Sequence, residues 1–168
     1  MQWEHITNII LIISLAVLAI FACLGLKQWI QRKSLKKVDP ELLWIPLPLA
    51  LMTVTYFIFD KLIIVATRPN GSGEPSFPSS HVMVVATILF LATIILPKYV
   101  KSQTTRIVIE VLTIIAISLT CMGRILSNMH SLFDVVGGVA FAFVFSEIYY
   151  YVIKKRSKHA KHLHTNHK

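Results

Sequence analysis

Chemically capable side chains concentrate in three short stretches of the chain, apart from its basic segments. In the first stretch, Lys61 and Arg68 lie about two helical turns apart, so we expect both side chains on one helix face. Taken alone, Lys61 could simply extend from a helix end to a membrane interface, and Arg68 followed by Pro69 is typical of a helix stop. Together they offer two cations to an anionic ligand.

The second stretch is Pro78-Ser79-Ser80-His81, which follows a loop rich in Gly, Pro and Ser and precedes an apolar run. A serine in this place commonly caps a helix. The start of a helix also offers free N–H groups and the positive end of its dipole, which bind phosphate readily. We therefore expect Ser79 and Ser80 beside a bound anion, with His81 in the first helical turn.

The third stretch contains Arg124, His130 and Asp134. His130 and Asp134 are spaced i, i+4, so they can touch on one helical face. A carboxylate beside a histidine fixes its tautomer and stabilises its charged form. A lone histidine near a membrane surface is usually incidental, but this one has a carboxylate partner and cations to face.

Taken together, the three stretches predict a phosphoryl-transfer site. Lys61, Arg68 and Arg124 supply positive charge for a phosphate, and the planar fork of arginine matches phosphate oxygens. The two histidines divide the remaining work, because one can attack phosphorus while the other protonates the leaving oxygen. A metal centre is disfavoured, because the acidic residues nearby form no pair at ligand spacing. We expect neither a metal nor another cofactor.

The elements that position these side chains are apolar runs. The chain is 55% hydrophobic and 15% charged, whereas a soluble domain usually carries about 25% charge. A bilayer crossing takes roughly 20 apolar residues. The sequence therefore predicts an all-α membrane bundle of about five spanning helices, over Ile6–Leu26, Leu42–Ala66, Val82–Leu96, Ile107–Met122 and Val135–Ile153.

The placement of basic residues predicts the orientation. Of 17 Lys and Arg residues, 14 fall in the segments Lys27–Lys37, Lys98–Arg106 and Lys154–Lys168, which share one side of a five-helix bundle. Basic loops stay cytoplasmic, so we expect the C-terminus inside, and the N-terminus and all three chemical stretches outside. The net charge of +9 then marks topology and contact with anionic lipids rather than nucleic acid. The first run lacks the basic start of a cleaved signal and is expected to remain a helix.

We expect one membrane-embedded domain over residues 1–153 and a basic cytoplasmic tail over 154–168. The tail contains four histidines between His159 and His167, a run that could bind a metal. A disordered basic tail is the favoured interpretation.

The spacing Lys61-x6-Arg68-Pro69, Pro78-Ser79-Ser80-His81 and Arg124-x5-His130-x3-Asp134 resembles the three-part signature of the type-2 phosphatidic acid phosphatase family, which shares its pocket with vanadium haloperoxidases. The resemblance implies that His130 is the nucleophile, Asp134 its orienting partner and His81 the acid for the leaving group. It also implies that phosphate is held by the cations and by backbone N–H groups near Ser79–His81.

The chain departs from the family pattern at three points. Ser80 stands where the family usually has Gly, which keeps the backbone N–H. Gly123 stands where it usually has Ser, so a phosphate contact made by that hydroxyl would be lost. The usual fold has six helices, and we expect the first to be missing here.

The expected activity is removal of phosphate from a membrane lipid through a phosphohistidine. In a bacterium this favours undecaprenyl diphosphate as substrate, with phosphatidylglycerophosphate or phosphatidate as alternatives. A haloperoxidase activity is disfavoured, because such enzymes are large and soluble. A non-catalytic protein with a relic motif is disfavoured too, because idle charges in a membrane are costly. The partners expected are the lipid phosphate substrate and membrane lipids.

Overall fold

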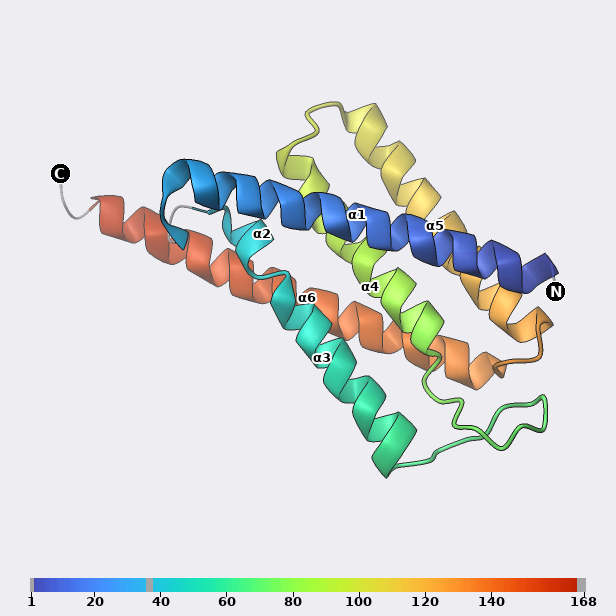
Figure 1. Ribbon diagram of the computed structural model, residues 1–168. Helices are drawn as coiled ribbons and strands as arrows, with labels where there is room; N and C mark the ends of the chain where they lie inside the picture. Colours follow the sequence, from blue (N-terminus) through green and yellow to red (C-terminus); the bar gives the residue numbers. More distant parts are fainter. Residues whose placement is uncertain (1, 36–37, 166–168) are drawn as a thin grey trace.

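The fold is a bundle of long helices, and the computed structural model describes residues 2–35 and 38–165, with side chains as far as Arg156. No β-strand occurs in these ranges, which confirms the predicted all-α class. Figure 1 shows the helices in chain order. They are α1 (Gln2–Arg32), α2 (Pro40–Leu43), α3 (Pro46–Phe57) with a π-helical turn at Ile58–Leu62, α4 (Ser80–Ile95) with a 3₁₀ turn at Leu96–Lys98, α5 (Gln103–Leu126) and α6 (Leu132–Thr165).

Five helices within the described ranges are long and apolar enough to cross a membrane, as the sequence predicts. They cover Gln2–Arg32, Pro40–Leu62, Ser80–Lys98, Gln103–Leu126 and Leu132–Arg156. The chain thus has the make-up of a multi-pass membrane protein.

The second span differs from the prediction in two ways: it is interrupted near its start, and it ends earlier than expected. It is broken between α2 and α3 at Trp44 and Ile45, just before Pro46, whose ring cannot continue a helix hydrogen-bond ladder. It ends at Leu62 rather than at Ala66, because Ile63, Ile64 and Val65 are β-branched and lower helix propensity. Residue 63 is already extended, so the expectation that Lys61 and Arg68 share a helix face is wrong.

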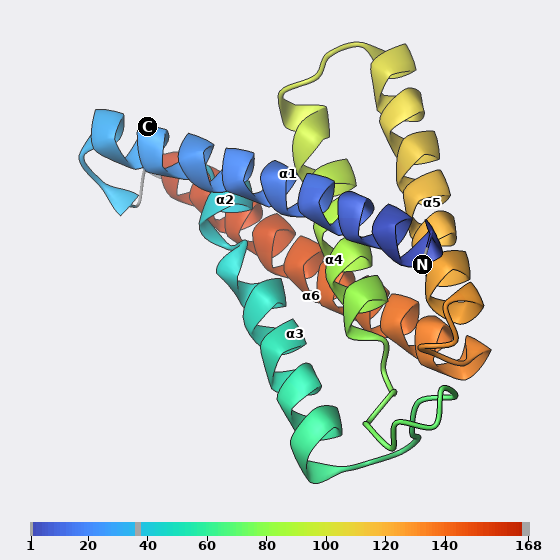
Figure 2. The same ribbon diagram turned by 45° about the vertical axis from the view of Figure 1, so that its right-hand side comes forward.

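The five spans alternate in direction and bring the three chemical stretches to one end of the bundle. Both views show α1, α4 and α6 starting at this end, and α3 and α5 finishing there (Figures 1 and 2). The N-terminus lies at the same end of the bundle, which we call the site end. As expected for five crossings, the three chemical stretches share this end.

The last helix runs on into the predicted tail. α6 continues to Thr165, so residues 154–165, which we expected to be disordered, are helical. They contain neither Gly nor Pro, and extending an existing helix costs far less than starting one. The side chains of the histidine run fall outside the described residues.

The centre of the bundle is α4, which contacts α1, α3, α5 and α6. Val85, Ala86 and Ile95 on this helix are completely buried. Away from the site end, the core gathers Phe21, Val38, Leu42, Ile45, Leu91, Ala92, Ile95, Tyr149 and Ile153. The end of the bundle opposite the site end is therefore held by a packed hydrophobic core.

Gly123 lets α1 approach α5 closely at the site end. A Cβ atom at position 123 would lie 2.4 Å from Thr7 Cγ2 and 3.3 Å from the Trp3 carbonyl oxygen. Thr7 is fully buried there. The glycine in place of the family's usual serine thus has a packing reason, because the first turns of α1 occupy the space that a side chain would need.

We predict that Gly123→Ser destabilises the protein by about 1–3 kcal/mol, the usual range for overpacking. Shortening the obstructing side chain in the double variant Gly123→Ser/Thr7→Ala should recover part of this loss. Thermal unfolding in detergent of the wild type, both single variants and the double variant measures the coupling. Strictly additive effects would contradict a direct contact between the two positions.

Candidate active site

A short hairpin-like loop places Arg68 at the site end. The Arg68 N–H donates to the Glu74 carbonyl (2.9 Å), and the Ser76 N–H donates to the Ala66 carbonyl (2.9 Å). Arg68 Nη1 also lies 2.8 Å from Glu74 Oε2, while its Nε is buried with no partner in the described chain. The loop therefore holds the guanidinium from one side and leaves part of it free for a ligand.

The start of α4 is fixed against the start of α6. The Ser79 N–H donates to the Asp134 carbonyl (3.0 Å). We expected this amide to be free for phosphate, and it is not. Gly138 allows the approach, because a Cβ at that position would lie 2.9 Å from the Ser79 carbonyl oxygen. The Ser79 hydroxyl is buried, does not cap the helix and has no partner in the described chain. The N–H groups of Ser80, His81 and Val82 lie in the first turn of α4, where amides have no partner within the helix, whereas the Met83 N–H donates to the Ser79 carbonyl (2.9 Å).

His130 lies in the turn between α5 and α6, two residues before α6 begins. Its backbone N–H donates to the Arg124 carbonyl (3.2 Å), and its side chain is buried. Nδ1 lies 2.9 Å from the Ser76 carbonyl oxygen. A carbonyl only accepts hydrogen bonds, so Nδ1 carries the proton and Nε2 keeps its lone pair in the neutral ring.

The electrostatic surroundings keep His130 uncharged. Burial, together with the positive charge of Arg124, lowers the pKa of His130 to about 4. Asp134 and the Ser76 carbonyl favour the charged form but do not outweigh these effects. At neutral pH the imidazole is therefore a free base.

Asp134 caps α6 and also lies near His130. Its Oδ2 accepts from the Ser131 N–H (2.7 Å), and its own N–H donates to Ser131 Oγ (3.3 Å). This reciprocal pair is a capping box, and the S-x-x-D spacing of residues 131–134 could have revealed it. The distance from Oδ2 to His130 Nδ1 is 3.8 Å, so Asp134 acts on the ring through charge, and the hydrogen bond goes to Ser76.

A small cavity of about 40 Å³ brings part of the predicted set together. Arg68, Ser80 and His130 line it, with further walls from Tyr56, Asp60, Pro75, Ser76, Phe77 and Pro78. We call it the phosphate pocket. Arg124 is buried close by, and both Arg124 and Arg68 act electrostatically on the half-buried His81. The Nε of Arg124 has no partner in the described chain.

Lys61 lies apart from this group. Its side chain is 63% exposed, and its Nζ is paired with Asp60 Oδ2 at 2.7 Å. It does not line the phosphate pocket, whereas its partner Asp60 does. The structure therefore assembles two of the three predicted cations and leaves the third on the rim.

Sequence reasoning missed four contributors to this geometry. The Ser76 carbonyl orients His130, Glu74 pairs with Arg68, Asp60 lines the pocket, and Gly138 admits the α4 turn. Backbone carbonyls and loop pairings leave no residue-type signal. The glycine pair at 137–138 inside an apolar helix was a visible sign of close packing.

The described residues contain no group of three or more His, Cys, Asp or Glu side chains placed to hold a metal ion. The group consists instead of two histidines, two arginines, a carboxylate and a helix start. Such a set can bind a phosphate dianion and move a proton.

These features define a multi-pass membrane protein with a small polar pocket at one end of its bundle. The family model of the PAP2 superfamily matches residues 9–158, and the chain belongs to that family. Membership confirms the resemblance to the type-2 phosphatidic acid phosphatases and indicates a phosphatase for lipid-type phosphates. No curated protein and no solved structure matches the chain.

The pKa of His130 predicts an acid-tolerant enzyme. Any activity that needs the Nε2 lone pair stops when the ring is protonated, so a pKa lowered from about 6.5 to about 4 moves that loss to more acidic pH. The pH profile of kcat/KM for an aryl phosphate should therefore keep its His130-dependent acid limb well below pH 6.5.

Asp134→Asn provides the comparison, because removing the carboxylate lowers the His130 pKa further. Ionisation of the substrate is common to both enzymes, so the difference between their profiles reports on His130. An Asp134→Asn profile displaced to higher pH would contradict the assigned electrostatics.

Proposed function

We propose that the chain is a lipid phosphate phosphatase that works through a phosphohistidine on His130. The observation that carries the proposal is the hydrogen bond between His130 Nδ1 and the Ser76 carbonyl. It leaves Nε2 as the lone-pair nitrogen of a buried neutral imidazole that lines the phosphate pocket. A nucleophile needs that protonation state before attack.

In the first step, Nε2 forms a bond to phosphorus as the bond from phosphorus to the leaving oxygen breaks. This oxygen is the bridging oxygen of a lipid diphosphate or the ester oxygen of a lipid monophosphate. His81 gives its proton to the departing oxygen. The phosphorylated ring is then positively charged, and the Asp134 carboxylate at 3.8 Å supplies a counter-charge. In the second step, water attacks phosphorus, His81 takes its proton, and phosphate leaves with Nε2 restored.

Charge neutralisation falls to the protein's cations. Arg124 and Arg68 lie closest to the two histidines, and both have a buried Nε without a partner in the described chain. Ser79 contributes through its unpaired hydroxyl and Ser80 through its helix-start amide. Lys61 joins once a phosphate competes with Asp60 for its ammonium group. In this mechanism no metal ion takes part, and activity is expected to survive chelation.

The proposed substrate is undecaprenyl diphosphate, with phosphatidylglycerophosphate or phosphatidate as the alternative. The pocket lies where helices α4 and α6 begin, so a headgroup reaches it while the hydrocarbon chain stays in the bilayer. The basic segments lie at the opposite end of the bundle, which supports a site on the extracytoplasmic face with a cytoplasmic C-terminus. Residues 1–153 form the proposed phosphatase domain.

The proposal predicts different behaviour from the two histidines. His81→Ala should lose about 10²–10⁴ in rate on a lipid monoester, which needs a proton on its leaving oxygen. The same variant should retain much more activity on p-nitrophenyl phosphate, because p-nitrophenolate leaves without a proton. Phosphate release from both substrates by purified protein in detergent measures the difference.

His130→Ala is the contrasting variant, since it lacks the nucleophile for either substrate. Equal loss of both activities in His81→Ala would contradict its role as the general acid. A wild type that releases no phosphate from any lipid or aryl substrate would favour the relic-motif alternative.

A further inference from the structure

A second cavity lies beside the phosphate pocket, between two membrane-spanning helices. It has a volume of about 280 Å³ and lies between α3 and α4. Both views show the end of α3 standing away from α4 at the site end (Figures 1 and 2). Met52, Thr53, Met83 and Val84 line this space, which we call the α3–α4 cleft.

The cleft and the phosphate pocket share two lining residues. Tyr56 and Ser80 contribute to both cavities, so the polar pocket and the apolar cleft meet along these side chains. The Thr53 hydroxyl donates to the Leu49 carbonyl within α3 and therefore offers the cleft no free donor. Together the two cavities have the polarity of an amphiphile, with anion-binding groups at one end and apolar side chains at the other.

We infer that the α3–α4 cleft holds the first part of the substrate's hydrocarbon chain while its phosphate lies against His130. The inference rests on the proposed function and adds the path by which the lipid enters. Both walls belong to membrane-spanning helices, so the open side of the cleft meets hydrocarbon rather than water. Methionines at two positions suit a flexible chain, because their side chains adapt to irregular partners.

The size of the cleft suits a hydrocarbon chain. It has a volume of about 280 Å³, and a chain is slender enough to lie along it with its phosphate end towards Ser80 and Tyr56.

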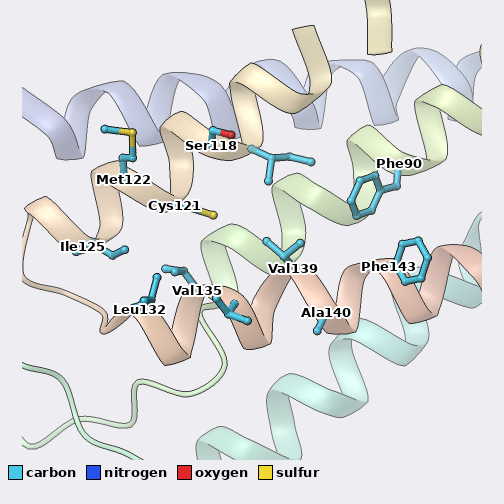
Figure 3. Close-up of a pocket in the computed structure, with 12 residues that line it drawn as sticks. Phe90, Ser118, Cys121, Met122, Ile125, Leu132, Val135, Val139, Ala140 and Phe143 are labelled. Carbon is cyan, nitrogen blue, oxygen red and sulfur yellow. The ribbon is translucent and has the colours of Figure 1, made fainter. Parts of the chain in front are cut away.

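A larger apolar groove between α5 and α6 is the rival site for the chain. It measures about 690 Å³, and Figure 3 shows Cys121 and Ile125 of α5 on the side that faces Leu132 and Val139 of α6. None of its lining residues lines the phosphate pocket. The α3–α4 cleft shares Tyr56 and Ser80 with that pocket, and for this reason we place the chain in the cleft.

The two sites make opposite predictions for two filling variants. Thr53→Phe fills the α3–α4 cleft, and Ala140→Phe fills the α5–α6 groove; both positions are exposed and tolerate a larger side chain. The readout is the ratio of kcat/KM for a long-chain lipid phosphate to kcat/KM for p-nitrophenyl phosphate. The aryl ester has no chain, so general damage to the site lowers both values and leaves the ratio unchanged.

We expect Thr53→Phe to lower this ratio by about tenfold or more, because misplacement of a reacting group by about 1 Å can cost about 10²-fold. Ala140→Phe should keep the wild-type ratio. An unchanged ratio in Thr53→Phe, or an equal or larger fall in Ala140→Phe, would overturn the inference. A wild type inactive on both substrates would instead refute the proposed function.

Discussion

Two hydrogen bonds between distant parts of the chain hold the candidate site together. The loop before α4 accepts from His130 Nδ1 at the Ser76 carbonyl, and its Ser79 N–H donates to the Asp134 carbonyl at the start of α6. The second of these bonds depends on the absence of a side chain at Gly138, because a Cβ there would lie 2.9 Å from the Ser79 carbonyl oxygen. The hydrogen bond to Ser76 sets which nitrogen of His130 carries the proton, and the bond to Asp134 fixes the start of α4 against α6.

Several polar side chains around these two hydrogen bonds are buried and have a hydrogen-bonding atom without a partner in the described chain. Apart from Thr87, the buried polar side-chain atoms without a partner in the described chain all belong to the site, on Arg68, Ser76, Ser79, Arg124 and Asp134. Leaving such atoms unpaired costs stability, and most proteins avoid it. Their concentration at one end of an otherwise apolar bundle suits the proposed phosphate site, because a phosphate would accept hydrogen bonds from the two arginines and the two serine hydroxyls. Asp134 Oδ1 is itself an acceptor and needs a different partner.

The class of fold and the gathering of the three chemical stretches at one end of the bundle could be predicted from the sequence, because both depend on residue type. Apolar run length predicted five spans, and the segregation of basic residues predicted which segments share an end of the bundle. Geometry that depends on backbone groups was not predictable in this way. The Ser76 carbonyl carries no signature, and the extended backbone after Leu62 separates Lys61 from Arg68 although their spacing fits a helix. Gly123 became explicable only when α1 was seen against it.

Trapping the phosphorylated enzyme tests whether His130 is the nucleophile that accepts the phosphate. Purified protein is mixed with a ³²P-labelled lipid phosphate, quenched within milliseconds and digested to locate the label. We expect an acid-labile, base-stable phosphate on His130 in the wild type and none in His130→Ala. Label on another residue, or a His130→Ala enzyme that still releases phosphate, would contradict it.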